Sequence, residues 1–256
     1  TSFNSTDGYV IRKSSRLGSG PLVVTVFRGL IPSNGSEGPY TPQGVDNYDP
    51  SATEGYFIGH SGKFFGELVI RRISTPGAIP SISSDILLNV NTTSFPIKCT
   101  HLSNTSLTNG NLDGLDFRLF AAHLRNGRPW TAHNIEVNAS GVATAGGGRN
   151  GSRWYEIQNL TTTPTLVQSG TIFDATAISP SSYFIPSVMV SGQGHAAFSM
   201  TTAGTNNRAN AATIGRLSSD AAGTTGTIVK TNASSTAYNP PRHPGARGAG
   251  HTVGGG

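Results

Sequence analysis

Residues 153–156 carry the side chains best suited to chemistry on a sugar. They place a cation, two aromatic rings and an acid in one run, Arg-Trp-Tyr-Glu. An arginine can bind a substrate carboxylate, and a positioned tyrosine or carboxylate can act as a nucleophile. Arg153, Tyr155 and Glu156 are therefore the candidate catalytic residues. If 153–160 is a strand, Tyr155 and Glu156 point to opposite faces, and the alternative for Glu156 is a salt bridge at the surface or at a sheet edge.

Glycoside hydrolysis would need a second acid near Glu156. The two carboxylates of such enzymes typically lie about 5–9 Å apart. The acids on or near expected strands are Glu67, Asp116, Glu136, Glu156 and Asp174. Whether two of them converge with an arginine in one concave pocket decides between an enzyme and a binding protein, and the sequence leaves both open.

Three aromatic residues are candidates for ligand binding. Trp130, Trp154 and Tyr183 could offer flat faces on which a sugar ring or a protein side chain stacks. The alternative for each of them is packing in the core.

A long polar loop precedes residue 55 and contains a possible metal site. Asp46, Asn47 and Asp49 supply the oxygen ligands that calcium prefers, although their spacing matches no EF-hand. The alternative is that these side chains form Asx turns, which shape the loop without a metal. We expect no other cofactor.

Two histidines flank the strongest hairpin signal in the chain. Asn126-Gly127 joins the apolar runs 117–125 and 128–137, and both residues tolerate the positive φ of a type I′ turn. A two-residue turn there pairs His123 with Trp130 and Phe120 with His133. The histidines then project from opposite faces, so we expect that they share no metal and that His123 packs in the core.

The elements that must position these residues are short strands in a repeated plan. Gln193-Gly194 occupies in a later copy the place of Asn126-Gly127, and the third strands ELVIRRIS, RWYEIQNL and ATIGRLSS correspond. Three copies of about four antiparallel strands predict an all-β, propeller-like array of blades, with a β-sandwich as the alternative. Apolar and polar residues do not alternate regularly in runs 118–124 and 186–191, which indicates inner strands buried on both faces. We expect a further strand at 95–102 and one domain over residues 1–239.

Composition agrees with an extracellular all-β protein. The chain has 33 Gly, 15 Pro and 12% charged residues, and its net charge is +5. No run of basic residues supports nucleic-acid binding, and no apolar run reaches the roughly 18 residues of a membrane helix. The single cysteine, Cys99, excludes an intramolecular disulfide and is expected to be a buried core thiol. We expect a secreted protein.

Several runs resemble a family of exported bacterial and environmental proteins that carry sialidase-like, BNR-type propeller repeats. The resemblance covers residues 1 to about 241 and implies a propeller fold and export more than an activity. The Asp-box pattern S-x-D-x-G-x-x-W is absent. The runs that carry the resemblance are NYDPSATEGYFIG, RLFAAHLRNGRPWTAHNIEV, RWYEIQNLTTTPTLVQSGTIFD, IPSVMVSGQGHAAFSMTTAGTN and ASSTAYNPP.

Residues 240–256 depart from that family in composition. They read PPRHPGARGAGHTVGGG and contain no acid and no apolar run. Either they are a natural flexible tail, or the reading frame has shifted near residue 241 and the last blade is missing. An array without its closing strands exposes strand edges, so we expect self-association into a homo-oligomer.

Two functions follow from these observations. The first is a secreted binding or assembly module that recognises a glycan or a protein, and the second is a sialidase-like glycoside hydrolase. We favour the first, because the sequence shows no complete catalytic set.

Overall fold

A computed structural model describes residues 5–32, 37–105, 110–232 and 234–239. The fold is all-β, as predicted, and the described residues form antiparallel sheets and a short helix, α1 (Lys13–Leu17). In the part of the chain that is described, no helix has the length and apolar character needed to cross a membrane. The expected tail, 240–256, lies outside the described residues.

Three sheets, here called I, II and III, form the body of the protein. Each one is mainly an up-and-down meander of strands that follow one another in the chain. Sheet I contains β3 (Pro39–Gly44), β5 (Glu54–Ser61), β6 (Glu67–Ser74), β7 (Ser81–Ile82) and β8 (Ile86–Asn89). Sheet II contains β9 (Ala121–Arg125), β10 (Arg128–Val137), β11 (Arg149–Gln158) and β12 (Thr165–Ile172), with β4 (Asp46–Asn47) added in parallel to β9. Sheet III contains β13 (Ser182–Val190), β14 (Ala196–Gly204), β15 (Asn207–Arg216) and β16 (Val229–Asn232).

The three predicted copies are therefore present. Their third strands, β6, β11 and β15, contain all or most of the three segments that the sequence analysis matched with one another. One predicted strand is wrong. Residues 95–102 are irregular apart from a single bridge between Cys99 and Leu112. Cys99 is nevertheless buried, and burial raises the pKa of its thiol to about 11, which fits an inert core position.

The sheets stack face to face with sheet II in the middle. One core cluster joins sheets II and III and includes Trp130, Trp154 and Phe198. A second cluster joins sheets I and II and includes Leu68 and Tyr155. Sheet II is thus covered on both faces, which explains the continuous burial along β10 and β11. This stack of antiparallel sheets fits both the propeller-like array and the β-sandwich that the sequence left open.

The outer strands depart from the expectation of two-sided burial. In β13, Val188 and Val190 are buried while Ser187 and Met189 are exposed, so this strand alternates cleanly and is covered on one face. The prediction that it is an inner strand is wrong, because sheet III has a neighbour on one side in the described structure.

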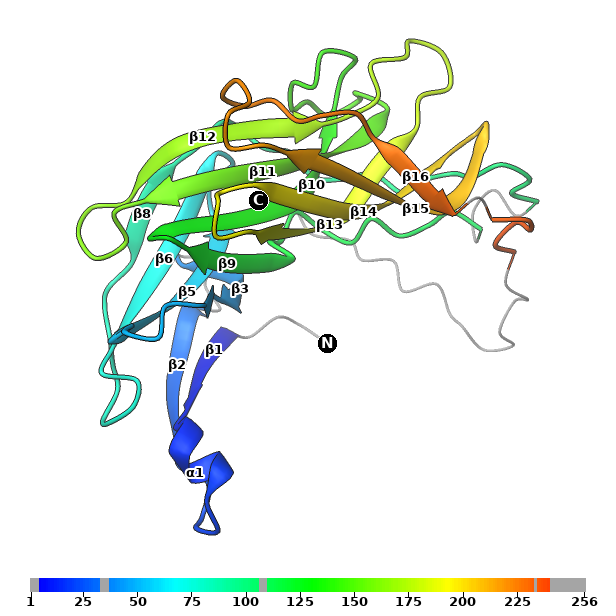
Figure 1. Ribbon diagram of the computed structural model, residues 1–256. Helices are drawn as coiled ribbons and strands as arrows, with labels where there is room; N and C mark the ends of the chain where they lie inside the picture. Colours follow the sequence, from blue (N-terminus) through cyan, green and yellow to red (C-terminus); the bar gives the residue numbers. More distant parts are fainter. Residues whose placement is uncertain (1–4, 33–36, 106–109, 233, 240–256) are drawn as a thin grey trace, which may run out of the picture.

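A separate hairpin extends away from the stacked sheets. It consists of β1 (Ser5–Ile11) and β2 (Val24–Pro32), with α1 at its far end (Figure 1). Its base is anchored by Leu30 and Ile31, which are buried.

The central hairpin has the predicted turn and register. Asn126 and Gly127 have φ values of 51° and 70°, as a type I′ turn requires, and His123 pairs with Trp130. The two histidines do lie on opposite faces. His123 Nε2 contacts the Val190 carbonyl on the sheet III side at 3.3 Å, whereas His133 Nε2 contacts the Tyr155 hydroxyl in the core toward sheet I at 3.0 Å.

We expect Gly127→Ala to lower the free energy of unfolding by about 1 kcal/mol, because alanine is strained at a φ of 70°. A Cβ at this position would meet no atom within 4 Å, so backbone strain is isolated from steric overlap. Urea unfolding measures the change. Gly77→Ala is the matched control, since its Cβ also enters open space and its φ is not positive. Equal effects of the two substitutions would contradict the turn assignment.

Candidate functional site

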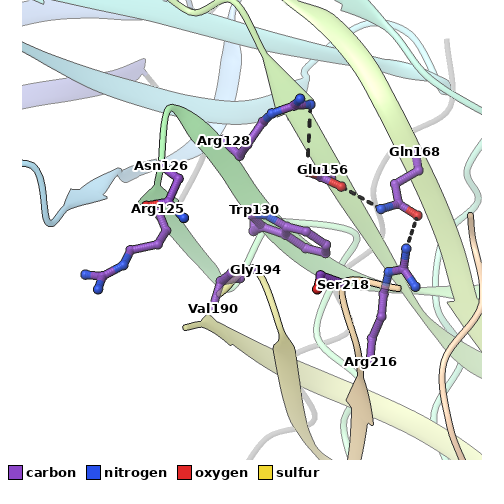
Figure 2. A pocket seen from close by; sticks show the side chains of 10 residues that line it. All are labelled: Arg125, Asn126, Arg128, Trp130, Glu156, Gln168, Val190, Gly194, Arg216 and Ser218. Atoms are coloured by element: carbon purple, nitrogen blue, oxygen red, sulfur yellow. Dashed lines mark hydrogen bonds and ion pairs between the residues drawn. The ribbon is translucent and has the colours of Figure 1, made fainter. Parts of the chain in front are cut away.

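A pocket opens between sheets II and III at the end where their hairpin turns meet. Its volume is about 120 Å³. We call it the inter-sheet pocket, and Figure 2 shows the side chains that define it. They are Arg125, Asn126, Arg128, Trp130, Glu156, Gln168, Val190, Gly194, Arg216 and Ser218.

Strand alternation brings Trp130 and Glu156 into this pocket. They are direct cross-strand neighbours on β10 and β11, and they face sheet III. The type I′ turn adds Asn126, whose Nδ2 donates a hydrogen bond of 2.8 Å to the Gly192 carbonyl. The β9–β10 turn is therefore tied to the β13–β14 turn, and the two turns form one wall of the pocket.

Glu156 is held by a short polar chain. Gln168 Nε2 donates to Glu156 Oε2 at 2.5 Å, and Arg128 Nη1 lies 3.8 Å from Glu156 Oε1. The other end of the Gln168 amide, Oε1, accepts bonds from Arg216 Nη2 at 3.0 Å and from the Gly223 amide at 2.9 Å. Figure 2 shows this relay from Arg128 through Glu156 and Gln168 to Arg216.

The three arginines of the pocket have different environments. Arg216 is 5% exposed, donates to the carbonyls of Asp220 and Ala221, and lies over the Trp154 ring at 5.8 Å. Arg125 lies over the Tyr48 ring at 5.6 Å, and its guanidinium points away from Trp130 in Figure 2. Among the described residues, neither forms an ion pair, so the pocket carries three guanidinium groups against one carboxylate.

The structure separates the three candidate catalytic residues. Glu156 faces sheet III and lines the inter-sheet pocket, whereas Arg153 and Tyr155 lie on the opposite face of β11. Tyr155 is 0% exposed, and burial raises the pKa of its hydroxyl to about 12. Glu156 and Tyr155 are therefore not placed to act on one substrate.

The aromatic candidates lie mainly in the core. Trp154 and Tyr183 are 1% and 6% exposed, and both belong to the cluster between sheets II and III. In this structure neither offers a free face to a ligand. Trp130 is 3% exposed, but it lines the inter-sheet pocket and stacks on Trp154 at 5.5 Å.

The loop proposed for calcium is shaped by Asx turns. Asn47 Oδ1 accepts the Asp49 amide at 3.0 Å, and Asp49 Oδ1 accepts the Ser51 amide and hydroxyl. These bonds from Ser51 lower the pKa of Asp49. Asp46 belongs to β4, beside β9. In the described part of the chain, no group of three His, Cys, Asp or Glu could hold a metal. Calcium binding by Asp46, Asn47 and Asp49 stays a prediction.

Two acids come together elsewhere, on the face of β6 that points away from sheet II. Burial and a hydrogen bond with the Glu37 carboxyl raise the pKa of Glu67. Arg71 pairs with Asp85 on the same face. This group is remote from the inter-sheet pocket, so it supplies no second carboxylate to Glu156.

Sequence reasoning missed Arg125, Arg128, Gln168 and Arg216. The sequence Arg-Asn-Gly-Arg could have indicated two of them, because it places one arginine on each side of a type I′ turn.

Comparisons of the chain with protein-family models, curated proteins and solved structures found no match.

Proposed function

We propose that the protein is a binding module that recognises an acidic glycan at the inter-sheet pocket. The observation that carries the proposal is the lining, which combines three arginines, two side-chain amides and one indole with a single carboxylate. Arginine binds carboxylate and sulfate groups with two parallel hydrogen bonds, and amides serve neutral sugar hydroxyls.

The size of the pocket indicates which part of a glycan it takes. At about 120 Å³ it has room for roughly four water molecules, using about 30 Å³ for each. It therefore suits a charged substituent, such as a sulfate or a uronate carboxylate. The rest of the glycan would lie across the β9–β10 and β13–β14 turns.

Binding fits this lining better than hydrolysis does. The pocket contains one carboxylate, Glu156, and a glycoside hydrolase of the usual kind uses two. Glu156 is also engaged by Gln168 and Arg128. A panel of chromogenic glycosides separates the two functions. We expect no turnover, and turnover that Glu156→Gln abolishes would overturn the proposal in favour of a hydrolase.

We expect the double variant Arg125→Gln/Arg128→Gln to bind sulfated or uronate oligosaccharides at least tenfold more weakly than the unmodified protein. Loss of charge-assisted hydrogen bonds, worth about 1.5–3 kcal/mol each, is the reason. A glycan array followed by calorimetry measures the change, and neutral oligosaccharides of equal length should bind weakly to both proteins.

The matched control for charge is Lys13→Gln/Arg16→Gln on α1, which removes two exposed cations far from the pocket. It should leave binding unchanged. An equal loss in the control would show that net charge alone attracts the glycan, and it would contradict a site at the inter-sheet pocket.

We also propose that the protein is secreted, that it belongs to the sialidase-like repeat family and that it self-associates. The support for self-association is the open array, which leaves sheet edges without a partner strand in the described structure. Light scattering should show a mass that rises with concentration, and a constant monomer mass would remove this part of the proposal.

A further inference from the structure

A second and larger cavity lies at the junction of sheets I and II. Its volume is about 410 Å³, and it is lined by residues 91–92, 141–143, 153 and 169–171. We call it the Arg153 cavity. It is separate from the inter-sheet pocket, because Arg153 lies on the face of β11 opposite to Glu156.

Arg153 is a buried cation without a counter-ion. Its side chain is 5% exposed, and its Nε donates to Thr171 Oγ1 at 2.6 Å. The Tyr155 hydroxyl also forms a hydrogen bond with the Arg153 side chain, whereas Nη1 is buried and has no hydrogen-bond partner. Burying an ion without a partner costs several kcal/mol, so such groups are normally paired or bound to a ligand.

No carboxylate of this chain supplies the missing partner. All 13 Asp and Glu residues lie in the described part of the chain, and none of them forms an ion pair with Arg153. The residues outside the described ranges contain no acid in their sequence. Within the chain, the charge of Arg153 is therefore left uncompensated.

The ionisable groups beside Arg153 are neutral. His133 on β10 and Thr171 on β12 are its direct cross-strand neighbours. Burial lowers the pKa of His133 to about 3 and raises that of Tyr155 to about 12, so both are uncharged at neutral pH. The remaining lining is neutral too, with an amide at Asn91 and hydroxyls at Thr92, Ser169 and Thr171.

We infer that the Arg153 cavity binds a small oxyanion, with the guanidinium of Arg153 pairing with its charge and the hydroxyl and amide residues contacting its other oxygens. Carboxylate, sulfate and phosphate groups share this chemistry, because each presents two oxygens that match the guanidinium fork. At about 410 Å³ the cavity holds more than the anionic group alone, so the anion would be part of a small polar molecule. This site does not depend on the proposed glycan pocket.

Thermal unfolding with defined probes tests the inference. Sulfate, phosphate and acetate are compared with chloride at equal ionic strength and pH 7.5. A bound anion should raise Tm by about 3 °C or more, since ligand binding to the folded state stabilises it. The rank of the three probes distinguishes a tetrahedral anion from a carboxylate. No rise beyond chloride with any of them would overturn the inference.

Variants assign the effect to its site. Arg153→Gln should abolish the rise in Tm, Arg153→Lys should keep part of it, and Arg128→Gln in the inter-sheet pocket should keep all of it. An unchanged rise in Arg153→Gln, or its loss in Arg128→Gln, would overturn the assignment. Because Arg128 lines only the inter-sheet pocket, the Arg128→Gln variant also distinguishes a failure of the anion site from a failure of the glycan proposal.

Crystals of the unmodified protein give a readout that does not depend on variant folding. Soaking with selenate, and separately with bromoacetate, should give an anomalous peak at contact distance from the Arg153 guanidinium. A cavity that stays empty with both probes would contradict the inference.

Discussion

The free energy of unfolding should fall as the pH is lowered from about 6.5 to about 4, because folding buries two neutral histidines. His60 and His133 are 0% exposed. Burial lowers the pKa of His60 to about 4 and that of His133 to about 3, against an ordinary value of 6.5. The unfolded chain binds protons below pH 6.5 while the folded chain does not, so stability is lost across that window.

Both rings stay neutral because burial outweighs their hydrogen bonds, since the bonds to the Ser61 and Phe117 carbonyls by themselves raise the pKa. In His60, Nδ1 donates to the Ser61 carbonyl and Nε2 accepts from the Thr93 hydroxyl, both at 2.8 Å. In His133, Nδ1 donates to the Phe117 carbonyl at 2.6 Å and Nε2 accepts from Tyr155. The carbonyls determine the tautomers, because each of them requires a proton on Nδ1. The ring centroids are 5.8 Å apart, so two charged rings would also repel.

The expected loss is large. A shift of one pKa unit corresponds to about 1.4 kcal/mol, so His60 alone accounts for about 3 kcal/mol between pH 6.5 and 4. Urea unfolding at half-unit pH steps measures it. The loss would continue toward pH 3 as His133 takes up its proton.

Variants distinguish the buried rings from general acid effects. His133→Gln should flatten the profile between pH 6.5 and 4 by about one proton, which is about 1.4 kcal/mol per pH unit. His195→Gln, at an exposed position, should leave the slope unchanged. A profile that is level from pH 6.5 to 4.5 in the unmodified protein would contradict burial of neutral histidines.

The second large effect is expected for Trp154→Ala, which should lower the free energy of unfolding by about 3–5 kcal/mol. Trp154 is 1% exposed and lies in the cluster that joins sheets II and III. Its ring stacks on Trp130 at 5.5 Å and packs against Phe198 at 5.6 Å. Removing it leaves a cavity at the interface between two sheets, and denaturant unfolding reports the loss.

A conservative substitution sharpens this test. The Trp154 indole N–H is buried without a hydrogen-bond partner in the described structure, so Trp154→Phe removes ring volume but breaks no hydrogen bond. It should cost clearly less than Trp154→Ala. Leu17→Ala, at a residue that is 77% exposed, should change stability by less than about 0.5 kcal/mol. A small effect of Trp154→Ala would show that sheets II and III do not depend on each other for stability.

Local rules account for what could be predicted about the site. The opposite orientation of Tyr155 and Glu156 follows from the alternation of a strand, and the structure shows it directly. The Asx turns at Asn47 and Asp49 follow from short-range hydrogen bonding, which was the alternative to calcium. The strand expected at 95–102 failed because an apolar run can pack as an irregular segment when its backbone finds other partners.

Turn chemistry and the spacing of apolar residues were sufficient for the all-β class, the three meanders and the register of the central hairpin, because those features depend on residues near one another in the chain. Only the tertiary structure decided which arginines have no carboxylate partner. Arg125 and Arg216 meet at one pocket only because sheets II and III stack, and Arg153 lacks a carboxylate only because every acid is placed elsewhere. Pairing of charges depends on distances between distant segments, and strand patterns do not encode those distances.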